Sequence, residues 1–272
     1  MKAFVFFLFF AFTPFIVSAQ QTLIDSGFTN RAEAKNLMVN NLKEGKWFEY
    51  IDSNDSKTTD TNAPYYALIV FKGGQPNGIV HQYYRDGKLY WLSKYVGGLE
   101  DGTSFQYYRS GKIMFEFTFV MGKQEGITKK YYESGALEGV SPWLNDKENG
   151  LFKEYYEDGK IEDEYFYKDG NEDGVGKEYY ENGQVSGEYP FKNGKQDGVT
   201  KEYYQSGKLS GIYPYKDGEL NGVAKDYYEN GKLKAKTTYK MGVDMETKNY
   251  GEDGKEVQIN EVIESPFSGG IK

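Results

Sequence analysis

The chain has 272 residues, a formal net charge of −8 and an aromatic content of 17%, made up mostly of 26 Tyr and 18 Phe. An acidic protein repels a polyanion through its average field, so we expect no nucleic-acid partner. The chain contains no cysteine, which excludes disulfides, thiolate metal sites and cysteine nucleophiles. A modest apolar content with many aromatic residues indicates a thin sheet built on aromatic side chains, not a thick core.

Residues 1–19 have the pattern of a signal peptide. Lys2 supplies the positive start, residues 3–17 the apolar run, and Val17, Ser18 and Ala19 a cleavage site of small residues. The alternative is a transmembrane anchor, but Pro14 interrupts the run, which is shorter than the roughly 20 residues that span a bilayer. No cysteine follows the cleavage site to accept a lipid. We expect an exported protein (periplasmic, cell-surface or secreted) without a transmembrane segment after cleavage, and not a lipoprotein.

Residues 78–231 repeat with a period of 24 residues, without an insertion or a deletion. One column contains only glycine, at Gly78, Gly102, Gly126, Gly150, Gly174, Gly198 and Gly222. A second column contains tyrosine pairs, at 83–84, 107–108, 131–132, 155–156, 179–180, 203–204 and 227–228. A fixed period of this length is typical of stacked repeats, in which each unit buries its apolar face only against its neighbours.

Each unit contains two short runs rich in β-branched and aromatic residues, bounded by Asn-Gly or Asp-Gly. These dipeptides favour positive φ and two-residue hairpin turns of the primed type. The strongest examples are Asp86-Gly87, Asp158-Gly159, Asn182-Gly183 and Asn230-Gly231. The sequence therefore predicts an all-β fold of tandem antiparallel β-hairpins that form an elongated, twisted single-layer sheet.

The predicted turns also fix a register. If each dipeptide occupies the two central turn positions, Glu157 faces Lys160 and Glu229 faces Lys232, and such opposite charges stabilise a hairpin. The same register pairs Tyr84 with Leu89, residue 82 with Trp91, and residue 80 with Ser93. Pro142, Pro190 and Pro214 recur in the second strand, where they predict a gap in the ladder and a bend.

This register divides the side chains between two faces. The inner face carries the second Tyr of each pair together with the columns of Leu89 and Tyr95, and we interpret it as structural. Small residues lie between these columns, so that an aromatic ring can lie flat across them, at Gly139, Gly187, Gly211 and Ala235. The outer face carries the first Tyr of each pair with a column of lysines at Lys129, Lys153, Lys177, Lys201 and Lys225.

The repeat degrades at both ends. Residues 45–50 and 65–74 resemble one unit that is interrupted by the Asp/Ser/Thr/Asn-rich segment 52–63, which we expect to be a flexible loop. Residues 250–254 match a unit that lacks one residue, with Glu246 in place of the column glycine. The predicted organisation is a signal peptide (1–19), an N-terminal segment or cap (20–42) with a short helix over 31–41, a repeat domain (43–255) and a C-terminal tail (256–272).

The unit at residues 198–209, followed by 215–222, resembles the variant MORN repeat (membrane occupation and recognition nexus), and the resemblance extends over residues 43–255. It implies antiparallel hairpins in a row and a binding or scaffolding role. Exported bacterial proteins of this type are often described as antitoxin-like. Ordinary MORN units begin with Tyr-x-Gly-x-Trp, a pattern that only Gly45, Lys46 and Trp47 approach here.

Nothing in the repeats predicts an enzyme, a cofactor or a metal site. The single histidine, His81, occupies a column that elsewhere holds Phe105 and lysines, so we interpret it as a surface substitution. The acidic residues beside turn glycines are explained by their backbone role. The acidic turn at 169–174 lacks the twelve-residue loop and terminal Glu of a calcium site.

Two functions remain open. The first is a non-catalytic exported scaffold that binds an unknown protein partner along the sheet or at its end strands. The alternative is a carbohydrate-binding module whose exposed tyrosines stack on an envelope glycan, although Trp47, Trp91 and Trp143 do not share a column. The candidate binding surface is the first-Tyr column, which could equally pack on lysine stems: Tyr83, Tyr107, Tyr131, Tyr155, Tyr179, Tyr203 and Tyr227.

Overall fold

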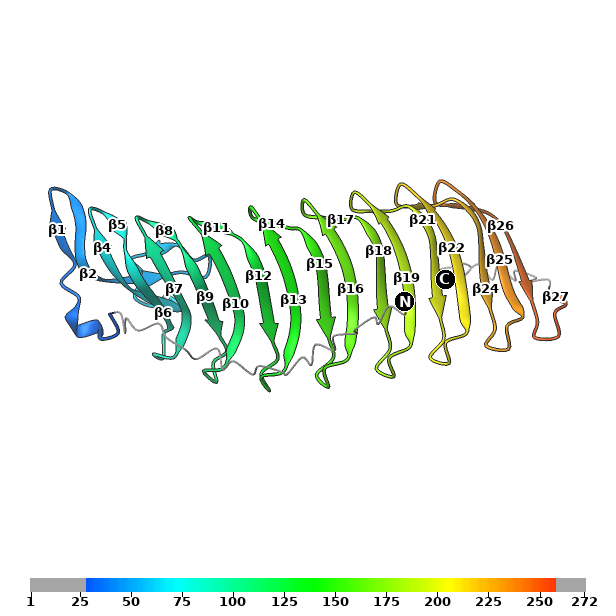
Figure 1. Ribbon diagram of the computed structural model, residues 1–272, viewed down its shortest axis with the longest axis horizontal. Coiled ribbons are helices and arrows are strands. Elements are labelled where there is room, and N and C mark those ends of the chain that lie inside the picture. Colours follow the sequence, from blue (N-terminus) through cyan, green and yellow to red (C-terminus); the bar gives the residue numbers. More distant parts are fainter. Residues whose placement is uncertain (1–27, 258–272) are drawn as a thin grey trace, which may run out of the picture.

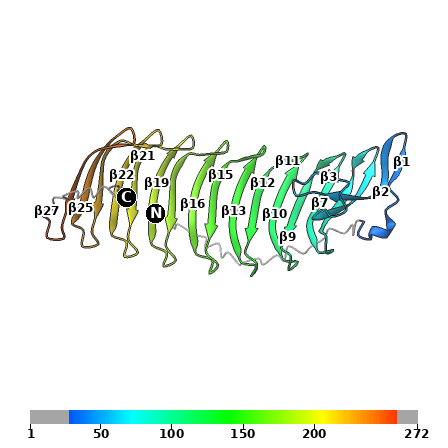
Figure 2. The ribbon, with the colours of Figure 1, turned by 180° about the vertical axis from the view of Figure 1, so that it is seen from behind.

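The computed structural model describes residues 28–257, so the predicted signal peptide and residues 258–272 of the predicted tail lie outside it. The described chain is one open antiparallel sheet, with successive hairpins side by side along the long axis (Figure 1). The same row is seen from behind in Figure 2, and over the repeats the described residues form no second layer on either face. The predicted all-β, single-layer fold is confirmed.

Each repeat contributes a two-residue, a six-residue and an eight-residue strand. The bounds are β8 (Leu99–Glu100), β9 (Gly102–Tyr107), β10 (Ile113–Val120), β11 (Lys123–Gln124), β12 (Gly126–Tyr131), β13 (Leu137–Leu144), β14 (Lys147–Glu148), β15 (Gly150–Tyr155), β16 (Ile161–Lys168), β17 (Asn171–Glu172), β18 (Gly174–Tyr179), β19 (Val185–Lys192), β20 (Lys195–Gln196), β21 (Gly198–Tyr203), β22 (Leu209–Lys216), β23 (Glu219–Leu220), β24 (Gly222–Tyr227) and β25 (Leu233–Lys240).

The ends are built from the remaining elements. At the N-terminal end these are the 3₁₀ turn η1 (Arg31–Glu33), β1 (Leu37–Val39), β2 (Leu42–Ile51), β3 (Lys57–Thr58), β4 (Tyr65–Lys72), β5 (Gln75–Pro76), β6 (Gly78–Tyr84) and β7 (Leu89–Val96). The last two strands are β26 (Val243–Tyr250) and β27 (Glu256–Val257).

The two turns of each repeat differ. At Asp169-Gly170 both residues have positive φ (51° and 84°), as a primed two-residue turn requires. At Asp158-Gly159 only the glycine has positive φ. The amide of Gly159 donates to the carbonyl of Tyr156 (2.8 Å) and that of Tyr156 to the carbonyl of Lys160 (2.9 Å), which closes a three-residue loop. The predicted two-residue turns at Asp158-Gly159 and its equivalents are therefore wrong, and so are the facing pairs Glu157–Lys160 and Glu229–Lys232.

The longer loop shifts the register only near the turn. Leu89 pairs with Tyr83, not with Tyr84 as predicted, whereas Gln82–Trp91 and Val80–Ser93 pair as predicted. A β-bulge at this point places one extra residue on the second strand, which compensates for the extra residue of the loop. The columns beyond the bulge keep their predicted faces. The Leu89 column does not, because Leu89 pairs with Tyr83 and its equivalent Ile161 with Tyr155, so it lies on the outer face beside the first tyrosines and its assignment to the inner face is wrong.

The prolines lie where the ladder to the next hairpin is interrupted. Pro190 falls between the residues of β19 that pair with β20 and those that pair with β21. Its carbonyl still accepts a hydrogen bond from Asp197 (2.9 Å), but no donor is needed there. The next strand begins at Gly198 with φ of 135°. The predicted ladder gap is thus confirmed.

The N-terminal end has a compact core on the inner face. Trp47, Ile69 and Phe71 are buried there together with Ile51, Ala67 and Val80. The segment 52–63, predicted to be a flexible loop, contains β3, which pairs with the end of β2. The helix predicted over 31–41 is also wrong, because only Arg31–Glu33 forms a 3₁₀ turn before β1 pairs with β2.

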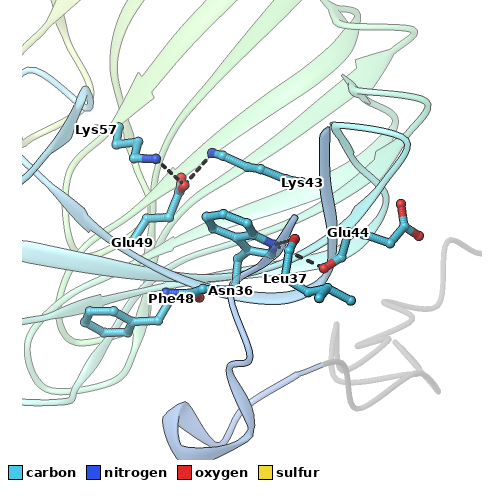
Figure 3. A network of polar contacts seen from close by, with 8 residues as sticks. Asn36, Leu37, Lys43, Glu44, Phe48, Glu49 and Lys57 are labelled. Carbon is cyan, nitrogen blue, oxygen red and sulfur yellow. Dashed lines mark hydrogen bonds and ion pairs between the residues drawn. The ribbon is translucent and has the colours of Figure 1, made fainter. Parts of the chain in front are cut away.

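A buried carboxylate completes this cap. Glu49 is 7% exposed and accepts ion pairs from Lys43 and from Lys57 (2.9 Å), as Figure 3 shows. Nearby, the indole of Trp47 donates to the carbonyls of Leu37 (3.2 Å) and Glu44 (3.1 Å). These bonds attach β1 to the first hairpin, which closes this end of the stack.

The C-terminal end differs because Glu246 stands where the repeats have glycine. Residues Val243–Tyr250 form one continuous strand, β26, which pairs with β25. In the repeats the glycine with positive φ separates a two-residue strand from a six-residue strand. The substitution of the column glycine therefore ends the repeat geometry.

Candidate interaction surfaces

The second tyrosines of the inner face connect neighbouring repeats. Tyr156 donates its hydroxyl to the backbone carbonyl of Tyr179 (2.5 Å), one repeat further on. The same contact is made by Tyr84, Tyr108, Tyr132, Tyr180, Tyr204 and Tyr228. Sequence analysis placed this column on the structural face but did not foresee the bond. A hydrogen bond of this kind contributes about 1 kcal/mol to stability.

Glycines on the inner face make room for tyrosine rings. A Cβ added at Gly187 would lie 2.3–2.4 Å from atoms of the Tyr189 side chain, and one added at Gly211 would lie 2.4–2.6 Å from atoms of Tyr213. Rings that lie flat across these glycines were predicted, without the column that supplies them. The rings that cover Gly187 and Gly211 come from the Ser93 column.

A row of carboxylates crosses the middle of the inner face. Asp163 lies directly opposite Glu154 on one side and Glu178 on the other. The hydroxyls of Tyr165 (2.7 Å) and Tyr189 (3.1 Å) donate to Glu178. Burial, reinforced by the neighbouring carboxylates, raises the pKa of Asp163 to about 6. Among residues 28–257 no group of three His, Asp or Glu side chains is arranged to hold a metal ion.

The seven predicted site tyrosines lie in one row on the outer face, all of them half-buried. Three of their hydroxyls donate to a carboxylate of the preceding repeat: Tyr131 to Glu116 (3.1 Å), Tyr179 to Glu164 (2.9 Å) and Tyr203 to Glu188 (3.3 Å). Burial and the contact with Glu164 raise the pKa of Tyr179 to about 12. In the central repeats these tyrosines are therefore part of a polar network.

Beside this row lies an apolar surface that sequence analysis missed. The residue after the column glycine points to the outer face and is exposed in five repeats: Ile127 (47%), Leu151 (45%), Val175 (56%), Val199 (49%) and Val223 (39%). Directly opposite four of them lie Pro142, Phe166, Pro190 and Pro214. We call these nine residues the apolar stripe. The sequence signal was the recurrence of an apolar residue after every column glycine except Gly102, which Thr103 follows.

Two rows of lysine flank the stripe, because residues two apart on a strand share a face. From β15 onwards the row on the first strands consists of Lys153, Lys177, Lys201 and Lys225. At the ends of the second strands it consists of Lys168, Lys192, Lys216 and Lys240. Three of the eight are ion-paired: Lys153 with Glu164 (2.7 Å), Lys201 with Glu188 (3.5 Å) and Lys216 with Asp197 (2.6 Å). The other five make no ion pair within residues 28–257.

The single histidine is not on the surface as predicted. His81 is buried and stacks on Tyr83, with ring centroids 6.1 Å apart. Its Nδ1 has no hydrogen-bond partner among the described residues, and burial lowers the pKa of the imidazole. It is a neutral packing residue, since burial is the cause of the lowered pKa and no carboxylate within residues 28–257 pairs with it.

These features define a tandem β-hairpin repeat protein whose open sheet has two chemically different faces. Six consecutive segments match the model of the MORN repeat variant: residues 100–121, 124–145, 148–169, 172–193, 196–217 and 220–241. The chain therefore belongs to the MORN repeat variant family. No helix in the described part of the chain has the length and apolar character to cross a membrane.

Comparison with curated proteins gives no match. Among solved structures the chain is similar to one described as "Crystal Structure of TcdB2-TccC3-Cdc42", with 14% sequence identity. The similarity covers 75% of this chain but only 14% of that chain, with a TM-score of 0.18. A similarity at this level carries no argument about function.

Proposed function

We propose that the chain is a non-catalytic, exported repeat scaffold that binds a protein partner along the outer face of its sheet. The observation that carries the proposal is the apolar stripe. Single exposed apolar residues are normal on protein surfaces, but a contiguous row indicates an interaction site. Repeats of this family generally serve as scaffolds that bind proteins or membranes.

The same residue types recur at each unit, which favours binding over catalysis. An enzyme requires a unique set of groups at one place, whereas a repeated surface offers many equivalent contacts. The proposal of export rests on residues 1–19 alone.

The carbohydrate alternative is not part of the proposal. Stacking on sugars requires open aromatic faces, and the first-Tyr column is half-buried, with Tyr131, Tyr179 and Tyr203 bound to carboxylates. Trp47 is 9% exposed. No observation favours a glycan as ligand.

Site-specific photo-crosslinking in the cells that produce the protein tests the proposal. A benzophenone amino acid at position 175 places the probe on the apolar stripe, and one at position 202 places it on the inner face as a matched control. We expect a discrete protein adduct from position 175 and none from position 202. The absence of any protein adduct from positions 151, 175 and 199, with binding of isolated envelope glycans instead, would contradict the proposal.

A further inference from the structure

We propose that the outer face between β15 and β25 is a docking site for an acidic, amphipathic polypeptide segment. In this arrangement the apolar side chains of the partner lie on the apolar stripe and its carboxylates pair with the two lysine rows. The inference rests on the proposed function and names the chemistry of the partner.

The dimensions fit a single polypeptide segment. The stripe crosses the strands, which lie about 4.8 Å apart, so the part from Leu151 to Val223 is roughly 30 Å long. In each row a lysine recurs every second strand, at about 10 Å. Each row lies two residues along the strand from the stripe, so the rows are about 13 Å apart. This width is close to the diameter of one α-helical segment with its side chains.

The charges select an acidic partner. Lys168, Lys177, Lys192, Lys225 and Lys240 make no ion pair within residues 28–257. Three carboxylates beside the lysine rows, Glu164, Glu188 and Asp197, are already engaged by lysines, and two of them by tyrosines as well. The region therefore carries unneutralised positive charge on a chain whose net charge is −8. Complementary charge directs the approach of a partner and penalises a basic one.

The shape of the outer face favours a polypeptide as the ligand over a lipid bilayer. Val175, Val199 and the prolines opposite them have short side chains, whereas the lysines on both sides are long. From Val175 to Pro214 the stripe is thus the floor between two rows of longer side chains. A planar bilayer meets the ammonium groups before it reaches this floor, but a narrow segment can lie between the rows.

Selection from a library of displayed random 16-residue peptides, performed on the whole chain, tests the inference. We expect enriched peptides in which apolar residues are interspersed with Asp and Glu, and whose affinity falls as salt concentration rises. Fluorescence anisotropy of a labelled enriched peptide should show at least tenfold weaker binding to the double variant Lys177→Glu/Lys192→Glu. The control variant Glu202→Gln, on the inner face of β21, should bind within twofold of the unaltered chain.

Two further variants separate binding from folding. Lys177→Gln/Lys192→Gln removes the charge without reversing it and should weaken binding less than the Glu variant. Val199→Ser alters the floor and should weaken binding at all salt concentrations. Circular dichroism and thermal unfolding of each variant report whether the sheet is intact. An intact Glu variant that binds the peptide as tightly as the unaltered chain overturns the inference.

The remaining outcomes are also decisive. Enrichment of basic peptides, or of peptides without charge preference, overturns the inference. So does lysine-dependent sedimentation with phosphatidylglycerol/phosphatidylcholine vesicles when no peptide is enriched, because the ligand is then a lipid surface. Peptides that bind only through the inner face refute the inference and the outer-face part of the proposed function, but leave a protein-binding scaffold. A failure of the proposed function is recognised separately, by the absence of protein adducts from the stripe.

Discussion

Replacing Asp163 by Asn should stabilise the protein near neutral pH. Asp163 lies directly opposite Glu154 and Glu178, and like charges that face each other across strands are destabilising. Burial is the main reason that its pKa rises from 3.8 to about 6, with Glu178 the next largest contribution. A carboxyl whose pKa is raised by folding costs stability when it is ionised.

The magnitude follows from the shift. About 2 pKa units correspond to about 3 kcal/mol at full burial, and solvent screening of this half-exposed group reduces the figure to about 1 kcal/mol. The cost is fully present above pH 6, decreases as the pH falls through about 6, and vanishes below the unfolded value of 3.8. Asp163→Asn removes the charge at every pH, so its advantage must shrink over this window.

Urea unfolding of both proteins at pH 7.5, 6 and 4.5 measures the effect. We expect Asp163→Asn to be more stable by about 1 kcal/mol at pH 7.5 and nearly equal at pH 4.5. Asp158→Asn is the control, because contact with Lys160 lowers the pKa of Asp158, so this variant should gain no stability at pH 7.5. A less stable Asp163→Asn protein at pH 7.5, or a difference that does not change with pH, would refute the reasoning.

Three more predictions concern stability. Tyr156→Phe should lower the free energy of unfolding by about 1 kcal/mol, because it removes the inter-repeat hydrogen bond. Tyr155→Phe is the control and should be nearly neutral, because the hydroxyl of Tyr155 makes no hydrogen bond to the described residues. Equal effects of the two variants in urea unfolding would contradict the inter-repeat bond. Gly187→Ala should lower the free energy of unfolding by about 2 kcal/mol, because the added methyl group overpacks against a tyrosine ring. Gly139→Ala should lower it less, because its Cβ would lie 3.3 Å from the nearest atom. A larger loss for Gly139→Ala than for Gly187→Ala would rule out the flat ring. Glu49→Gln should cost about 1–2 kcal/mol because two lysines lose their partner, and an unchanged thermal midpoint would show that this ion pair is not stabilising.

The fold was largely predictable from the sequence, and the errors in the predicted turns have a definite cause. A period of 24 residues with glycine and tyrosine columns specifies stacked hairpins. The sequence dipeptide Asp158-Gly159 resembles Asp169-Gly170, yet the first forms a three-residue loop and the second a primed turn. The dipeptide alone cannot distinguish them, because the difference lies in which flanking residues bond across the turn. The bulge after the first turn then hides the error from the rest of the register.

The candidate surface was predicted less well. The first-Tyr column was predicted as the binding surface because its residues are large and repeated. In the structure the hydroxyls of Tyr131, Tyr179 and Tyr203 instead bind carboxylates. The apolar stripe was not predicted from the sequence. Its short Val and Pro side chains come from separate strands, and they form one surface only because the register places Val175 opposite Pro190 and Val199 opposite Pro214. The solvent exposure of these side chains depends on the assembled sheet and cannot be inferred from one column of the repeat alone.

The most direct test of two distinct faces uses the absence of cysteine from the chain. Single substitutions Val199→Cys and Thr200→Cys place a thiol on the outer and the inner face of β21, at adjacent positions. Val199 is 49% exposed and Thr200 only 2%, so a maleimide should label position 199 at a rate close to that of a free thiol and position 200 far more slowly. Equal rates, or faster labelling at position 200, would contradict the register and with it the apolar stripe.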